Sequence, residues 1–193
     1  PPVPETAVEG LEAVREQAAA VGVVISALSG TWNMAHPNLA YRATMRGRFE
    51  WVLQAAQILG APIVTLCTGS RDAGNMWAHH GQNTSAAAWA DMADELSHAL
   101  DRAAPYGLRL GIEPEPANVI CDAAAARRIL DQLQAPHLGI VLDAANLIAP
   151  EQAANQQAIL DHALDLLGGN LLLAHAKDHD AFGDRKSTRL NSS

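Results

Sequence analysis

The chain has 193 residues, of which 49% are hydrophobic and 18% charged, a composition typical of a globular domain rather than of a disordered or collagen-like chain. Its formal net charge of −8 disfavours nucleic acid as a partner, because phosphates need a basic face. No apolar run approaches the roughly 20 residues that cross a bilayer, so we expect no membrane partner.

Short apolar segments alternate with longer stretches in which apolar residues recur at helical spacing. Glycines such as Gly22 and Gly60 follow two of these stretches, where a helix stop is expected, and Asp122 can cap the fourth helix. In chain order the predicted elements are helix 8–21, strand 23–28, helix 45–59, strand 62–67, helix 89–103, strand 109–113, helix 122–133, strand 138–143, helix 159–167 and strand 171–175.

The predicted strands are nearly continuous apolar runs, which is typical of a parallel sheet covered by helices. Repeated strand–helix units fit either a doubly wound sheet or a (β/α)8 barrel. The sequence has no GxGxxG turn and no P-loop, one of which a doubly wound nucleotide binder usually carries, so the barrel is favoured. A full barrel needs about 250 residues, and this chain opens on a helix. We therefore expect an incomplete (β/α)8 TIM barrel of about five βα units, without the first strand and the last two units.

The composition changes near the end of the chain. Residues 184–193 are polar and basic and show none of the periodicity found before them. We expect residues 1–183 to form the partial TIM-barrel domain and residues 184–193 to be a non-native or disordered tail.

Three successive predicted strands end in a potential metal ligand, namely Glu113, Asp143 and His175. In a parallel barrel all strand carboxyl ends lie on one face, and neighbouring strands are about 5 Å apart, so these side chains can surround one point. Two carboxylates and an imidazole suit one divalent ion such as Mn, Co, Mg, Fe or Zn. A single carboxylate at a strand end is more often a helix cap or an ion-pair partner, but three ligands in successive units favour a metal site.

The segments around these residues resemble a known family. They read EPEP at 113–116, LDAANL at 142–147 and HAKD at 175–178, and a loop adds CTGSRD at 67–72, NMW at 75–77 and HH at 79–80. In order and spacing they are similar to the xylose-isomerase-like sugar phosphate isomerase/epimerase family of TIM barrels. The resemblance covers about residues 5–183 and implies a barrel that is truncated at both ends.

The resemblance implies one divalent ion held by Glu113, Asp143, His175 and a second Glu, which would come from a last strand that the sequence does not contain. It also implies that the metal polarises a substrate carbonyl and the adjacent hydroxyl while two carboxylates move a proton through an enediolate. Glu113 would be one catalytic carboxylate and the absent Glu the other, so this chain alone is not expected to be fully competent. Relatives often have a histidine at the position of Asn146, which can form hydrogen bonds but cannot titrate.

Further residues near the strand ends are expected to contact the substrate. Arg71 suits a carboxylate or a phosphate, although pairing within its own loop explains it equally well. Trp32 could stack on a sugar, although packing is the more common use of a tryptophan. For Cys67, which ends a strand, a buried packing role is expected. The predicted substrate-binding residues are Trp32, Arg71, His80, Glu115, Asn146, Lys177 and Asp178.

The leading hypothesis is a metal-dependent sugar or sugar-phosphate isomerase or epimerase, with a small-molecule sugar as partner and a possible homo-oligomer. A lyase that dehydrates a keto-inositol, and a sugar-binding barrel without catalysis, remain alternatives. An endonuclease IV-like phosphodiesterase is disfavoured, because it would need several metals and a basic groove. The two cysteines, Cys67 and Cys121, form no disulfide framework, so a cytoplasmic location is expected.

Overall fold

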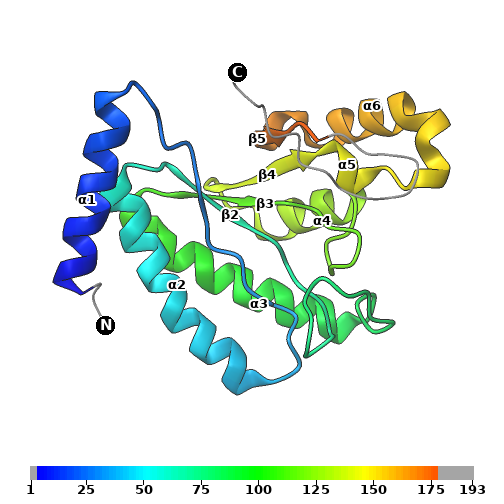
Figure 1. Ribbon diagram of the computed structural model, residues 1–193. Coiled ribbons are helices and arrows are strands. Elements are labelled where there is room, and N and C mark those ends of the chain that lie inside the picture. Colours follow the sequence, from blue (N-terminus) through cyan, green and yellow to red (C-terminus); the bar gives the residue numbers. More distant parts are fainter. Residues whose placement is uncertain (1–3, 178–193) are drawn as a thin grey trace.

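The computed structural model describes residues 4–177, and its centre is one parallel sheet (Figure 1). The strands are β1 (Leu28–Ser29), β2 (Ile63–Leu66), β3 (Arg109–Ile112), β4 (Leu138–Asp143) and β5 (Leu171–His175). The helices are α1 (Glu5–Ala20), α2 (Leu39–Leu59), α3 (Ala86–Ala103), α4 (Ala123–Leu133), α5 (Ala144–Leu147) and α6 (Gln156–Leu167). Short 3-10 helices cover Ala104–Tyr106, Pro150–Asn155 and Gly168–Asn170.

The strand order is β1-β2-β3-β4-β5, and every neighbouring pair is parallel. A doubly wound sheet reverses its strand order at a switch point, whereas the successive units of a barrel follow one another in sequence order. Helix α2 packs on β1, β2 and α3, while α4 packs on β4 and α6, so the connecting helices lie along the sheet (Figure 1). The described chain is therefore part of a (β/α)8 barrel, as the sequence predicts.

The helix ends follow from local side chains. Helix α2 begins at Leu39, before the start predicted near 45, because the Asn38 side chain accepts hydrogen bonds from the N–H groups of Ala40 and Tyr41. It stops at Gly60, which adopts a left-handed φ of 70°. The predicted cap of α4 is confirmed, since Asp122 accepts a 2.7 Å bond from the Ala125 N–H.

Of the strand predicted at 23–28, only Leu28 is confirmed, as the first residue of β1. Only Leu28 and Ser29 pair with β2, and residues 23–27 have no regular structure. Val23 and Val24 are 57% and 84% exposed, so their apolar character does not reflect burial. In the described sheet β1 is an edge strand, so it can form hydrogen bonds with β2 alone. Its pairing with Val64 and Thr65 of β2 extends over only two residues.

None of the described helices is both long enough and apolar enough to cross a membrane. The proposed tail, residues 184–193, lies outside the described residues, and so does Asp178.

Candidate metal centre

Three strand ends place the predicted ligands side by side. Asp143 and His175 are the last residues of β4 and β5, and they face each other in the strand register. Glu113 directly follows β3, and its N–H donates to the Leu66 carbonyl at 2.8 Å, which continues the ladder to β2. The ligand atoms of Glu113, Asp143 and His175 all lie within 4.8 Å of one another.

The two distances from the imidazole nitrogen fit a shared divalent ion. His175 Nδ1 lies 3.3 Å from Glu113 Oε1 and 3.6 Å from Asp143 Oδ2. Two ligands that are each about 2.1 Å from one ion lie roughly 3 to 4 Å apart. Asp143 Oδ1 accepts a hydrogen bond from the Ala145 N–H at 3.1 Å, which directs Oδ2 towards the other two ligands. The donor set of two carboxylate oxygens and one imidazole nitrogen suits a divalent ion of borderline hardness.

The carboxylates lie in a strongly charged environment. Burial raises the pKa of Glu113, the positive charges of His175 and Lys177 oppose that rise, and the nearby Asp143 carboxylate adds to it. The Lys177 ammonium group contacts Asp143 Oδ2 and lies 3.7 Å from Glu113 Oε1. Burial alone would lower the pKa of Lys177, but the two carboxylates outweigh it and raise that pKa. Lys177 is thus the counter-ion of both acids in the described chain.

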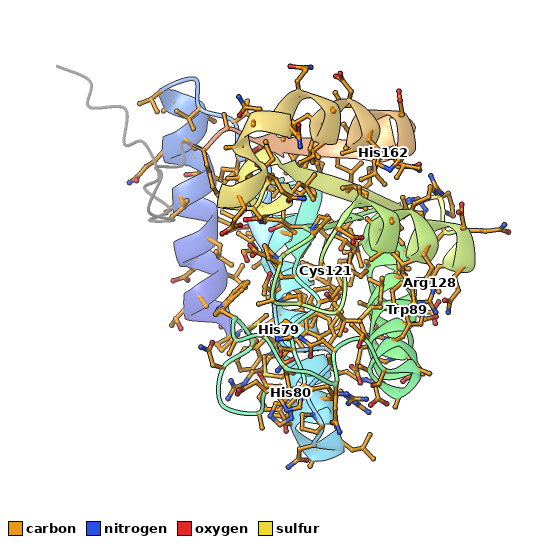
Figure 2. The ribbon with its side chains drawn as sticks, turned by 90° about the vertical axis from the view of Figure 1, so that its right-hand side faces the viewer. His79, His80, Trp89, Cys121, Arg128 and His162 are labelled. Carbon is orange, nitrogen blue, oxygen red and sulfur yellow. The ribbon has the colours of Figure 1, made fainter. Side chains whose placement is uncertain are left out.

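A cavity of about 460 Å³ opens beside the cluster. Glu113 and His175 line it together with residues 26–29 of the chain around β1, so both edges of the described sheet border the same space. A second cavity of about 490 Å³ lies between the first turns of α3 and α4, beside Trp89, Cys121 and Arg128 (Figure 2). That second cavity contains none of the three predicted ligands, so we place the candidate centre in the first one.

Two more predicted substrate residues, Glu115 and Asn146, lie against the cluster, as Lys177 does. Asn146 Nδ2 donates to Glu113 Oε1 at 3.1 Å and to Glu115 Oε1 at 2.8 Å. It also donates to the Pro114 carbonyl at 3.1 Å. Both side chains are buried, so they form the wall of the site next to the Glu113 carboxylate.

Other predicted substrate residues lie elsewhere or are already engaged. Trp32 is 3% exposed and packs on Phe49, with ring centroids 4.8 Å apart. Arg71 pairs with Asp91 of α3 at 2.7 Å and donates to the Ala35 carbonyl.

His80 belongs to the loop between β2 and α3. In Figure 2 this loop lies in the lower part of the molecule, whereas α6 with His162 lies at the top. Neither His79 nor His80 lines the cavity that contains Glu113 and His175. The substrate roles of His80, Trp32 and Arg71 stay predictions.

Three buried asparagines join the strand-to-helix loops to one another, and the sequence analysis did not identify them. Asn33, after β1, accepts a hydrogen bond from the Ser70 N–H at 3.0 Å. Asn118, after β3, accepts one from the Gly69 N–H at 2.7 Å. Asn83, before α3, donates to the Ala117 carbonyl at 2.8 Å. The recurrence of asparagine in successive strand-to-helix loops was the available signal, because its amide can satisfy backbone groups on both sides.

Cys67 is buried at the end of β2, where a packing role was expected. Burial raises the pKa of its thiol to about 12, and the charges of Glu113 and Glu115 add to this effect. A thiol in this environment is a poor nucleophile.

Comparisons with known proteins agree with this architecture. The family model described as xylose isomerase-like TIM barrel matches residues 2–191. No curated protein sequence matches the chain. Solved structures with a similar fold include a D-tagatose 3-epimerase-like protein, with 17% identity and a TM-score of 0.71 over 90% of this chain and 63% of that one.

Two further structures are similar to the same extent. The IolI protein with a bound zinc atom has 16% identity and a TM-score of 0.69, over 88% of this chain and 57% of that one. The probable 3-DHS dehydratase AsbF from Bacillus anthracis has 12% identity and a TM-score of 0.71, over 90% and 58%. At such identities the likeness concerns the fold, and the chain spans less than two thirds of the length of all three structures.

Proposed function

Because the chain belongs to the xylose isomerase-like TIM barrel family, we propose that it carries the metal centre of a sugar isomerase or epimerase. The observation that supports this most directly is the convergence of Glu113, Asp143 and His175, with ligand atoms within 4.8 Å of one another. These three residues would hold one divalent ion, of which Mn, Co, Mg and Zn all suit the donor set. The zinc atom in the IolI structure supports a metal on this fold.

A divalent ion in this position would polarise a carbonyl and the neighbouring hydroxyl of a sugar or sugar phosphate, which lowers the cost of removing a proton from carbon. We assign Glu113 as the base that removes this proton. Its carboxylate lines the cavity in which a substrate would lie, as a base that acts on the substrate must. Lys177 offers an ammonium group beside Glu113, where it would steady a negatively charged oxygen of the substrate.

The proton step can be tested without knowing the product. Ketoses and their phosphates are incubated with the metal-loaded chain in D2O, and deuterium at the carbon next to the carbonyl is followed by NMR. Because Glu113 is also a proposed ligand, the ion is supplied in saturating excess and its binding to the variant is measured. We expect incorporation that is lost in Glu113→Gln even with the ion bound, because the amide cannot accept the proton. Incorporation at the wild-type rate in Glu113→Gln would contradict the assignment of Glu113 as the base.

A lyase on the same fold is the second candidate, since the probable dehydratase AsbF is among the similar structures. Both reactions begin with proton removal next to a carbonyl, and they part at the next step. A lyase would release water and give an unsaturated product, whereas an isomerase or epimerase returns the proton to carbon. Mass spectrometry of the product therefore separates the two, because dehydration lowers the mass by one water.

A further inference from the structure

Asn146 links the metal ligands more closely than a substrate-contacting residue would. It lies in α5, three residues after Asp143, and it is 3% exposed. Its amide nitrogen donates to Glu113 Oε1, to Glu115 Oε1 and to the Pro114 carbonyl at 3.1, 2.8 and 3.1 Å. One side chain from α5, the helix after β4, therefore bonds to three acceptors in the segment after β3.

The acceptor on Glu113 is the oxygen that we assign as the metal ligand. Glu113 Oε1 also faces His175 Nδ1 at 3.3 Å, so the Asn146 amide and the imidazole meet at the same carboxylate oxygen. A donor on a ligating carboxylate fixes its orientation, and the loss of such a donor typically weakens metal binding 10- to 100-fold.

The same amide also contacts a second buried carboxylate, that of Glu115. Glu113 Oε1 and Glu115 Oε1 bond to one nitrogen, so the two oxygens lie no more than about 6 Å apart. Two carboxylates at this separation repel each other in a poorly solvated site. The Asn146 amide is uncharged, and its two hydrogens are shared among Glu113 Oε1, Glu115 Oε1 and the Pro114 carbonyl, so it contacts both acids without neutralising either of them.

The local fold explains why Asn146 reaches this position. Asp143 ends β4 and caps α5 by accepting from the Ala145 N–H, which starts a helical turn at the ligand. A residue three positions later lies about one turn along on the same side of a helix. The side chains of Asp143 and Asn146 therefore project from the same side of this short helix. Asp143 faces the other two proposed ligands, and Asn146 faces Glu113.

We propose that Asn146 is a positioning residue of the metal centre, which locks Glu113 in its ligating orientation and fixes its distance from Asp143. This proposal rests on the function proposed above, because it presumes a metal ion between Glu113, Asp143 and His175. It differs from the substrate contact that the sequence suggests, since a positioning residue acts before any substrate is present.

The test is a titration of the 193-residue chain with Co²⁺ in the absence of sugar, followed by calorimetry and by the visible absorption of the bound ion. Asn146→Ala removes the amide, and Asn146→Ser retains a small polar group that is too short to bridge the two acids. The matched control is Asn118→Ala, because Asn118 has the same 3% exposure and bonds to Gly69 and Met76 rather than to an acid. Circular dichroism shows whether each variant is folded.

We expect one Co²⁺ per wild-type chain, at least tenfold weaker binding in both Asn146 variants, and an altered visible spectrum of the ion that remains. The control should bind within about twofold of wild type and keep its spectrum. Wild-type affinity and spectrum in the folded Asn146 variants would overturn the positioning role while leaving the metal site intact. A wild-type chain that binds no Co²⁺ would instead overturn the proposed metal centre, and the positioning role with it.

Discussion

His175 Nδ1 lies 3.3 Å from Glu113 Oε1, although 62 positions separate the two residues in the chain. Neither local sequence nor a helical repeat can produce this contact. It arises because β3, β4 and β5 are parallel neighbours, so that their carboxyl ends lie at one edge of the sheet. Asp143 occupies the position between them and is buried, which leaves three ligand atoms around a single point.

The first prediction concerns Lys177, which contacts Asp143 and lies near Glu113. Lys177→Met removes the positive charge that faces both carboxylates, so the metal-free protein should melt several degrees lower. The same change should strengthen binding of Mn²⁺ or Co²⁺, because the ion no longer competes with an ammonium group. Calorimetry and thermal melts with and without metal measure both effects.

The control for this prediction is Arg102→Met, which removes an equal charge from an ion pair with Glu50 outside the cluster. Metal affinity should be unchanged in this variant. Weaker metal binding in Lys177→Met than in Arg102→Met would show that the ammonium group supports the ion rather than competes with it.

The second prediction concerns the reactivity of Cys67. A thiol reacts as the thiolate, so a pKa of about 12 leaves about one Cys67 in ten thousand ionised at pH 8. In the native protein Ellman's reagent should therefore modify Cys67 very slowly, with a rate that rises about tenfold per pH unit as the pH approaches 12. Cys121, which is only half-buried, should react first. In urea, where the chain is unfolded, both thiols should react rapidly. Two fast native thiols at pH 8 would be inconsistent with this environment.

The third prediction concerns the ion pairs between α2 and α3. Glu95 is buried and pairs with both Arg42 and Arg46, and Arg42 is buried as well. Glu95→Ala leaves the buried Arg42 guanidinium with Asp91 as its remaining carboxylate partner, and we expect unfolding to become about 2 to 3 kcal/mol easier in urea denaturation. Asp94 bonds to the same Arg46 at 2.8 Å, but its side chain is 73% exposed, so Asp94→Ala should cost less than about 1 kcal/mol. Equal losses in the two variants would refute this ranking.

The fourth prediction concerns Gly69, which has a φ of +74° and lies against Asn33. A Cβ at Gly69 would fall 2.1 Å from Asn33 Oδ1, the atom that accepts from the Ser70 N–H. Gly60 has a similar φ of +70°, but a Cβ there would meet no atom within 4 Å. Gly60→Ala should therefore cost only the roughly 1 kcal/mol of backbone strain, and Gly69→Ala at least about 2 kcal/mol more. Urea denaturation of the two variants gives the comparison, and a similar cost at both glycines would show that the loop gives way.

The sequence predicted much of this fold because parallel strands leave a strong signal. Strands buried on both faces are continuous apolar runs, so β2 to β5 were identified close to their observed bounds. The same signal failed at 23–28, where Val23 and Val24 are apolar but exposed beside an edge strand of two residues. Composition describes a segment, but a strand also needs a neighbour to pair with.

The candidate site divides in the same way. The proximity of Glu113, Asp143 and His175 followed from the strand order, which fixes where strand ends meet. The partners of Arg71 and Asn146 could not be predicted from the strand order, because they depend on the conformations of loops that join distant parts of the chain. An arginine in a loop can face a substrate or a helix, and only the packed structure shows that Asp91 of α3 pairs with it.

The most direct test of the metal centre is the metal content of the chain. The chain is loaded with Mn²⁺, Co²⁺ or Zn²⁺, free ions are removed, and the bound metal is measured by inductively coupled plasma mass spectrometry. We predict one ion per wild-type chain and a loss of most of it in each of Glu113→Gln, Asp143→Asn and His175→Ala, with Asn118→Ala unchanged. A wild-type chain that retains no ion, or three ligand variants that retain as much as the wild type, would contradict the metal centre.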